Sequence, residues 1–253
     1  MKTLLENYGD AVRLVAGSGA ARVLVVCEHA SNRIPEALGD LGLDDDARNS
    51  HIAWDPGALN VAKTLAANLR APLVHGTISR LVYDCNRPPE APSAIVQVSE
   101  DCEIPGNVGL ATQARQARVD HVYVPFHRML GQLAKIHGLK LLVSIHSFTP
   151  VYKGVRRDVE IGLLHGKDDR FARAMLANRP SGIGYDTRLN EPYGPLDGVL
   201  HTIELHGPPN GNLSVMVEVR SDLISNAADE DAMAACLADW IETTLQAFPA
   251  EGA

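Results

Sequence analysis

Two short apolar runs, far apart in the chain, each end in a histidine. Residues 22–28 read Arg-Val-Leu-Val-Val-Cys-Glu before His29, and residues 139–145 read Leu-Lys-Leu-Leu-Val-Ser-Ile before His146. Continuous apolar runs of this length are typical of parallel strands that are buried on both faces. Ligands of such sheets bind beyond the carboxyl ends of the strands. The pattern therefore predicts that both imidazoles lie at one functional edge of an α/β sheet, where they could bind a metal.

The segments around these runs alternate between strand and helix patterns. Asp55-Pro56 predicts a helix start with Asp55 as the N-cap, because apolar residues follow at helical spacing from 59 to 69. The stretch 110–137 also has helical spacing, and Pro125 inside it predicts a kink or a split. Further strands are expected at 159–164 and 213–219, and helices at 171–176 and 229–245. The alternation predicts a mostly parallel or mixed sheet with helices on both faces.

Composition narrows the class of protein. The chain has 253 residues, of which 45% are hydrophobic, and a net charge of −8. This length can form one large α/β domain or two closely joined lobes. The negative charge argues against a nucleic-acid groove or an anionic membrane surface as partner and favours a small substrate. Neither a membrane span nor a signal-peptide core is evident, so we expect a cytoplasmic protein. Its four cysteines lack paired zinc or redox spacing and are expected to be reduced.

Glu218 stands inside an apolar strand pattern, Leu213-Ser-Val-Met-Val-Glu218-Val. Desolvating a carboxylate there is costly unless it is paired or faces a cleft at the strand end. One interpretation is a structural ion pair with Arg220. The other is a general base, because burial raises a carboxyl pKa toward the neutral range that a base needs.

A third pattern surrounds the apolar stretch 81–83. Arg80 precedes it, and Asn86-Arg87 follows it with two groups that can grip a carboxylate. The alternative is a solvated turn, since Pro88 comes next. The stretches 88–109 and 182–198 are rich in Pro, Gly and polar residues, and we expect them to form loops near the active site.

Together these blocks resemble the N-formylglutamate amidohydrolase family. The similarity runs from about residue 22 to residue 224, and blocks at 51–55, 125–128 and 190–193 also resemble it. The main blocks are His29-Ala-Ser-Asn32, Asp84-Cys-Asn86-Arg87-Pro, Ser144-Ile-His146-Ser and Val217-Glu218-Val-Arg220-Ser-Asp222-Leu-Ile224. The resemblance implies hydrolysis of N-formyl-L-glutamate to L-glutamate and formate, a step of histidine degradation. A related hydrolase of another N-acyl amino acid or small peptide, or a metal-free amino-acid-binding protein, are the alternatives.

That family is in turn similar to the zinc carboxypeptidases and aspartoacylases. This implies a three-layer α/β/α fold with a central mixed, mostly parallel sheet, and a Zn²⁺ or other divalent transition-metal site. Their metal motif is a histidine, a glutamate three positions later and a distant histidine, so His29 and His146 match while Asn32 stands at the middle position. A neutral amide is a poor zinc ligand. The missing carboxylate or imidazole could come from Glu28, Asp55 or His51.

The same resemblance implies roles for the other blocks. Glu218 would be the general base, Arg80 would polarise the scissile carbonyl, and Asn86 and Arg87 would hold a substrate carboxylate. Further candidates for substrate binding, each with an ordinary structural alternative, are Arg157, Asn190, Tyr193, His127 and His206. We expect a single amidohydrolase domain over residues 1–253 with residues 1–20 as an N-terminal extension. Its partner would be a small N-acyl amino acid rather than nucleic acid or membrane, and homo-oligomerisation stays open.

Overall fold

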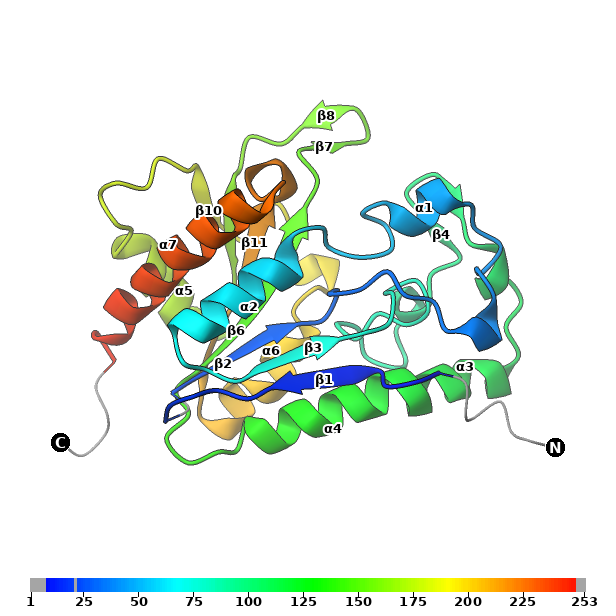
Figure 1. The fold of residues 1–253 in the computed structure, drawn as a ribbon, viewed down its shortest axis with the longest axis horizontal. Helices are drawn as coiled ribbons and strands as arrows, with labels where there is room; N and C mark the ends of the chain where they lie inside the picture. Colours follow the sequence, from blue (N-terminus) through cyan, green and yellow to red (C-terminus); the bar gives the residue numbers. More distant parts are fainter. Residues whose placement is uncertain (1–7, 21, 249–253) are drawn as a thin grey trace.

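A seven-stranded sheet forms the centre of the computed structural model, which describes residues 8–20 and 22–248 (Figure 1). Four of the neighbouring strand pairs are parallel, while β1–β3 and β11–β9 are antiparallel. The expected mixed, mostly parallel sheet is therefore confirmed. In spatial order its strands are β1 (Val12–Val15), β3 (Leu73–Gly76), β2 (Val23–Cys27), β6 (Leu141–Phe148), β11 (Leu213–Arg220), β9 (Ile161–Leu164) and β10 (Thr187–Leu189).

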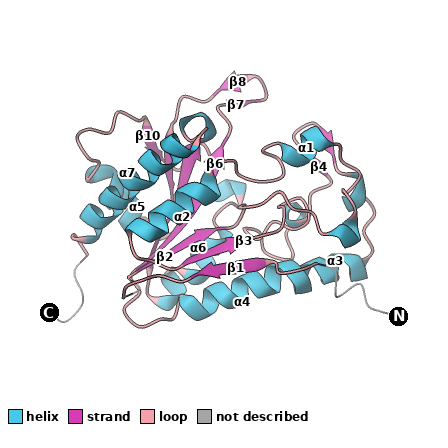
Figure 2. Ribbon diagram, viewed as in Figure 1, coloured by secondary structure: helices cyan, strands magenta, loops and turns pink. Residues whose placement is uncertain are grey.

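Helices cover both faces of this sheet (Figures 1 and 2). One face packs against α2 (Ala58–Asn68), α5 (Arg170–Ala177) and α7 (Ala227–Leu245), and the other against α4 (Val124–Leu133) and α6 (His201–His206). Alternate residues of each strand supply the two cores. In β2, Val23 and Val25 pack on the first face, and Leu24 and Val26 pack on the second. The expected three-layer α/β/α architecture is confirmed.

The start of α2 differs from the prediction. The helix begins at Ala58, and its N-cap is Gly57 rather than Asp55. Gly57 has φ +80°, and a Cβ there would lie 2.7 Å from the backbone oxygen of Ile224, so only glycine fits. Asp55 was wrongly interpreted as the cap, because its carboxylate turns away from the helix and joins the site described below.

The split predicted near Pro125 takes the form of a π-helical turn rather than a gap between two helices. Helix α3 (Thr112–Arg118) continues into a π-helical turn at Val119–Tyr123, and α4 follows directly. Pro125 is the second residue of α4, and because the helical backbone runs on from Tyr123, its missing N–H interrupts the regular hydrogen-bond pattern at this point. The wider π turn accommodates the change of helix at this point.

Short elements surround the carboxyl end of the sheet. Helix α1 (Asp45–Asn49) and the hairpin of β4 (Val98–Ser99) and β5 (Cys102–Glu103) lie on one side, and the hairpin of β7 (Val151–Tyr152) and β8 (Val155–Arg156) lies on the other (Figure 1). Turns of 3-10 helix occupy Glu36–Leu38, Pro92–Ala94, Pro105–Asn107, Pro195–Asp197, Pro208–Asn210 and Ser221–Leu223. These connections supply much of the pocket described below.

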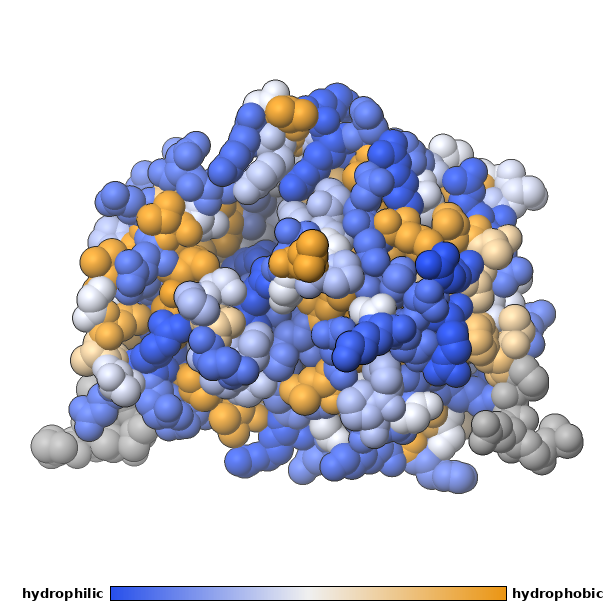
Figure 3. Space-filling model, turned by 180° about the vertical axis from the view of Figure 1, so that it is seen from behind, coloured by the Kyte–Doolittle hydropathy of each residue, from blue (hydrophilic) through white to orange (hydrophobic). Residues whose placement is uncertain are grey.

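Most large apolar side chains are buried in the two cores on either side of the sheet, and the surface is mixed. On the face opposite to Figure 1, apolar residues form separate groups among hydrophilic ones (Figure 3). Within residues 8–20 and 22–248, no helix has both the length and the apolar character needed to cross a bilayer. All four cysteine thiols are free, as expected. Part of the predicted N-terminal extension, residues 12–15, is the edge strand β1, while residues 1–7 lie outside the described residues.

Candidate active site

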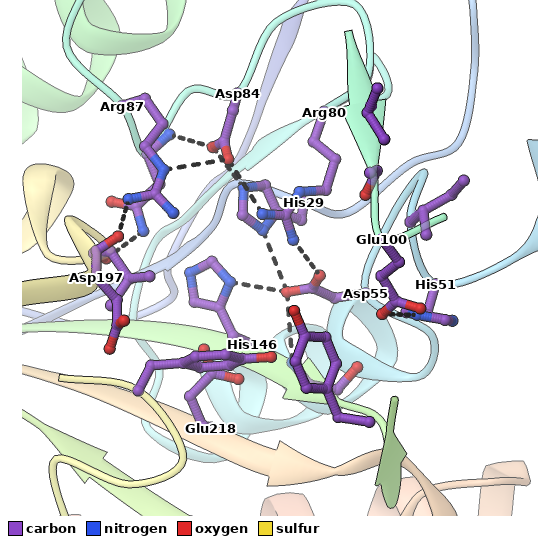
Figure 4. A pocket seen from close by; sticks show the side chains of 18 residues that line it. His29, His51, Asp55, Arg80, Asp84, Arg87, Glu100, His146, Asp197 and Glu218 are labelled. Carbon is purple, nitrogen blue, oxygen red and sulfur yellow. Dashed lines mark hydrogen bonds and ion pairs between the residues drawn. The ribbon is translucent and has the colours of Figure 1, made fainter. Parts of the chain in front are cut away.

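Three neighbouring strands deliver the central side chains of the site. His29 follows the end of β2, His146 lies near the end of β6, and Glu218 of β11 is the direct neighbour of His146 in the parallel register. The two imidazole rings meet edge to face, with 4.8 Å between their centroids. The structure thus brings together the two histidines that the sequence pattern placed at one sheet edge (Figure 4).

Asp55 completes a compact group with the two histidines. Its Oδ2 lies 2.7 Å from His146 Nδ1 and 3.3 Å from His29 Nδ1. The backbone N–H of Asp55 donates to the carbonyl of His29 at 2.9 Å, which fixes the 50–55 segment against the loop after β2. One potential ligand atom from each of the three buried residues lies within 4.8 Å of the other two. Two imidazoles and a carboxylate are a donor set that Zn²⁺ accepts.

The far nitrogens of both rings contact carboxylates. His29 Nε2 lies 2.7 Å from Asp84 Oδ1, and His146 Nε2 lies 3.1 Å from Glu28 Oε2. Glu28 in turn accepts a hydrogen bond from Ser144 Oγ at 2.7 Å. Metal-binding histidines commonly use the nitrogen opposite the metal in this way. The Nδ1 atoms of both rings therefore face Asp55, in an orientation that suits a metal. Glu28 contacts the opposite nitrogen of His146, so it does not lie with Asp55 among the candidate ligands.

Two other candidate ligands lie elsewhere. The side-chain amide of Asn32 donates to the carbonyl of Arg48 at 3.2 Å and to Asn49 Oδ1 at 3.0 Å, so the structure does not bring it to the histidines. His51 lines the pocket, but its Nε2 lies 2.8 Å from Glu100 at the rim. The sequence left open which residue is the third ligand. Of its carboxylate candidates, Asp55 is the one that contacts the Nδ1 atoms of both histidines.

Glu218 is a buried carboxyl group on β11. It is 5% exposed, and its buried Oε2 has no hydrogen-bond partner among the described residues. Burial raises the pKa of Glu218 to about 7, with Asp55 adding to the increase and the neighbouring His146 opposing it. Arg220 does not pair with it, because its guanidinium bonds to Glu160 and Asp222 instead. The interpretation of Glu218 as the ion-pair partner of Arg220 is therefore wrong, and the general base stays a prediction.

Two arginines stand beside this group. Arg80 contacts Asp55 Oδ1 at 3.4 Å and Asp84 Oδ2 at 3.1 Å, and its side chain is 30% exposed. Arg87 donates to the backbone oxygen of Asp197 at 2.6 Å. Although burial alone would raise the pKa of Asp84, His29 and Arg80 hold it well below its usual range. Asp84 is therefore an ionised link between the histidine and both guanidinium groups.

A pocket of about 390 Å³ opens over these residues. Its volume is in the range of small-molecule sites. Both predicted loops contribute, residues 88–109 through the β4 hairpin and residues 182–198 through Tyr193 and Asp197. The residues that line it are His29, His51, Ile52, Asp55, Arg80, Asp84, Asn86, Arg87, Val98, Ser99, Glu100, His146, Ser147, Tyr152, Tyr193, Asp197, Val199 and Glu218.

Asn86 lines the pocket, but its amide is already used by the protein. Its Nδ2 donates to the carbonyl of Val199, and its Oδ1 accepts the N–H of Thr202 at 3.0 Å. These two bonds join the segment that carries Asp84 and Arg87 to Val199 and to the first turn of α6. The structure therefore places Asn86 as a brace of the pocket wall.

Arg157 and Asn190 support the wall rather than line it. The Arg157 guanidinium lies 4.7 Å from the Tyr152 ring centre and 5.0 Å from that of Tyr193, a cation–π arrangement with two pocket residues. Asn190 Oδ1 accepts the backbone N–H of His165 at 2.9 Å. Of this group of predicted substrate residues, the structure brings only Tyr193 to the pocket.

His127 and His206 form a buried pair outside the pocket lining. His127 Nε2 donates to the carbonyl of Cys85 at 2.8 Å, which leaves Nδ1 to accept from His206 Nε2 at 2.9 Å. Burial lowers the pKa of His127 to about 3 and that of His206 to about 4, so both rings are neutral near pH 7. The pair braces the chain at Cys85, next to Asp84, and neither histidine lines the pocket.

Asp84 and Ser144 were not assigned roles from the sequence. Asp84 stands in the block Asp84-Cys-Asn86-Arg87, and Ser144 lies two residues before His146 on the same face of β6. A histidine that binds a metal usually donates its second N–H to a carboxylate or another acceptor. This rule could have identified Asp84 as a candidate from the sequence.

Comparisons with known proteins agree with this geometry. A family model described as N-formylglutamate amidohydrolase matches residues 21–225. A solved structure of a gene product from Agrobacterium tumefaciens shares 48% identity, with a TM-score of 0.91, over 95% of this chain and 97% of that one. An N-formylglutamate amidohydrolase from Ralstonia eutropha has a similar fold, with 16% identity, a TM-score of 0.66, and coverage of 94% and 99%. Among curated proteins no match was found. Because the family model covers most of its length, the chain belongs to the N-formylglutamate amidohydrolase family.

Proposed function

We propose that this protein hydrolyses the amide bond of an N-acyl amino acid in a metal-dependent reaction, with N-formyl-L-glutamate as the first candidate substrate. The observation that carries the proposal is the unpartnered Glu218 carboxyl beside the His29–Asp55–His146 group, in a pocket of small-molecule size. Family membership supports amide hydrolysis, and the specific substrate and the metal are our inference.

The donor set fits a divalent ion. His29 Nδ1, His146 Nδ1 and an oxygen of Asp55 would hold it, and Asp84 and Glu28 would keep the two rings in position. A bound ion would supply Lewis acidity, which polarises a carbonyl group and lowers the pKa of a water molecule.

Glu218 would perform the proton transfers. Its deprotonated carboxyl accepts the proton that the attacking water loses as the new C–O bond forms. The same group then donates that proton to the amide nitrogen as the C–N bond breaks, so the products are a carboxylic acid and a free amine. A pKa of about 7 suits both directions of transfer. Arg80, which is permanently charged, stabilises the negative oxygen of the tetrahedral intermediate, a contribution of about 3 kcal/mol.

Arg87 would recognise a carboxylate of the substrate. It lines the pocket with its side chain 14% exposed, so a carboxylate bound to it would be largely shielded from water. A planar guanidinium matches the two oxygens of a carboxylate, which would fix the orientation of the acyl group relative to Glu218. Tyr193 lies in the same lining and would contact the rest of the amino acid.

The experiment combines metal analysis with a substrate panel. Protein purified without chelators is assayed for bound metal and tested on formyl, acetyl and succinyl derivatives of glutamate and on formyl derivatives of neutral and basic amino acids. We expect about one metal ion per chain and fastest release of formate from N-formyl-L-glutamate. Glu218→Gln should keep the metal but lower kcat by about 10²–10⁴-fold, since the base is lost.

Glu103→Gln is the matched control, because Glu103 is an exposed glutamate outside the pocket lining. Full activity after exhaustive dialysis against EDTA would contradict the metal requirement. Preference for an acetyl or succinyl derivative would replace the proposed substrate but keep the reaction. Undiminished binding of amino acids without metal or hydrolysis would show instead a binding protein with this fold.

A further inference from the structure

A second cavity, of about 660 Å³, lies beside the edge strand of the sheet. In Figure 1, β3 lies between β1 and β2, with α2 above them, and residues of β1, β3 and α2 line the cavity. Its lining is Val12, Arg13, Leu14, Val15, Ala30, Ser31, Arg33, Leu59, Lys63, His75, Gly76 and Thr77. None of these residues lines the active-site pocket, so the two cavities are separate.

The charge of this cavity opposes that of the whole chain. The protein has 31 acidic and 23 basic residues, yet the cavity lining contains Arg13, Arg33 and Lys63 and no Asp or Glu. Arg13 of β1 and His75 of β3 are direct cross-strand partners in the antiparallel register, so their side chains lie on the same face. Lys63 approaches that face from α2.

His75 has one nitrogen left for a ligand. The residue is 7% exposed, and its Nδ1 donates to the carbonyl of Gly76 at 2.9 Å. Its Nε2 has no hydrogen-bond partner among the described residues. Burial lowers the pKa of His75, the bond to Gly76 opposes this decrease, and the nearby charges of Lys63 and Arg13 add to it.

Arg33 has a different part in the cavity. Its guanidinium donates to the backbone carbonyls of Tyr8, Asp10 and Thr77. It therefore contributes a fixed positive charge to the wall. Because no Asp or Glu lines the cavity, the positive charges of Arg13 and Lys63 have no acidic partner within its lining.

We propose that this cavity is a binding site for a small oxyanion, a phosphate or a carboxylate, held by Arg13, Lys63 and His75. Such a ligand would neutralise the charges of Arg13 and Lys63. The Arg13 guanidinium can bind two oxygens of the anion as a planar fork, and the Lys63 ammonium adds a compact charge. His75 donates from Nε2 when it is protonated, and a neighbouring anion favours that protonated form.

The test observes His75 directly. The imidazole C–H signals of the full-length protein are recorded by NMR, and the His75 signal is assigned with His75→Asn. Inorganic phosphate, sulfate, succinate and L-glutamate are then titrated at constant ionic strength. We expect a saturable shift of the His75 signal, with a Kd of about 1–5 mM for at least one anion. Removal of each charge, by Arg13→Gln or Lys63→Gln, should weaken binding about tenfold or more.

The control is Lys167→Gln combined with Arg170→Gln, two exposed residues that change the net charge as much as the double variant Arg13→Gln/Lys63→Gln. Lys63 is itself exposed, so Lys63→Gln alone provides a variant that folds. Saturation by phosphate and sulfate alone assigns a phosphoryl-type ligand, and saturation by succinate or glutamate alone assigns a carboxylate. If no anion saturates the shift up to about 20 mM, or if the double variant binds as tightly as the control, the proposal is overturned.

Discussion

Replacement of Asp84 by asparagine tests whether the carboxylates behind the histidines prepare the metal site. Asp84 is 4% exposed, and its Oδ1 accepts hydrogen bonds from His29 Nε2 at 2.7 Å and from the backbone N–H of Asn86 at 2.9 Å. Its Oδ2 accepts from Arg80 at 3.1 Å. Asparagine keeps the shape but has only one acceptor oxygen, so its NH₂ group must face either the imidazole or the guanidinium, both of which are donors.

The expected loss follows from these contacts. Removing a carboxylate behind a metal-binding histidine lowers metal affinity about 10–100-fold, which corresponds to roughly 1.4–2.7 kcal/mol. The unpaired buried donor should also lower the free energy of unfolding by about 1–3 kcal/mol. Because Glu218 and Arg87 are unchanged, hydrolysis should return in part when metal is supplied in excess.

The assay is competition with a chelator of known affinity, which yields the metal Kd, together with thermal unfolding of the metal-free protein. Asp186→Asn is the matched control, because Asp186 also pairs with an arginine, Arg188, but its side chain is 42% exposed. A wild-type metal Kd for Asp84→Asn would refute the idea that Asp84 orients His29. Equal losses in both variants would point to a general effect of charge.

Three further outcomes are expected. Because Glu218 must be deprotonated to accept a proton and its pKa is raised to about 7, kcat/KM should fall as pH drops through about 7. A bound cation moves this limb to lower pH, and a profile with no acidic limb down to about pH 4 would exclude Glu218 as the base. His127→Phe removes the donor to the Cys85 carbonyl and should lower the free energy of unfolding in urea by about 1–3 kcal/mol, so an unchanged midpoint would contradict a bracing role. Trp240→Phe, at a fully buried position, leaves the Met175 carbonyl without its donor at 2.6 Å and should cost a similar amount, whereas wild-type stability would show that water replaces the indole.

The fold could be predicted where the apolar pattern is long. Strands β2, β6, β9 and β11 and helices α5 and α7 lie close to the expected ranges, because each buries a continuous or periodic apolar surface. Strands β1, β3 and β10 were not predicted. They have only three or four residues each, and β1 is largely exposed, so neither periodicity nor hydrophobicity separates them from loops.

The site could be predicted where a residue ends a strand, and less well where it depends on packing. His29 and His146 each follow an apolar run, which indicates their place at the sheet edge. Asp55 has two local interpretations, a helix cap and a ligand, and only the position of Gly57 against Ile224 excludes the cap. The pairing of His127 with His206 depends on how α4 meets α6, which no local pattern specifies.

The Asn86 side chain has a consequence for how this enzyme family can change its substrates. Its single amide joins the stretch that carries Asp84 and Arg87 to a second stretch of backbone, at Val199 and Thr202, which lies 113 and 116 positions further along the chain. One side of the pocket therefore behaves as a unit. Widening that side by directed evolution requires libraries that vary both stretches together, because a change confined to one of them leaves the other held in its original place.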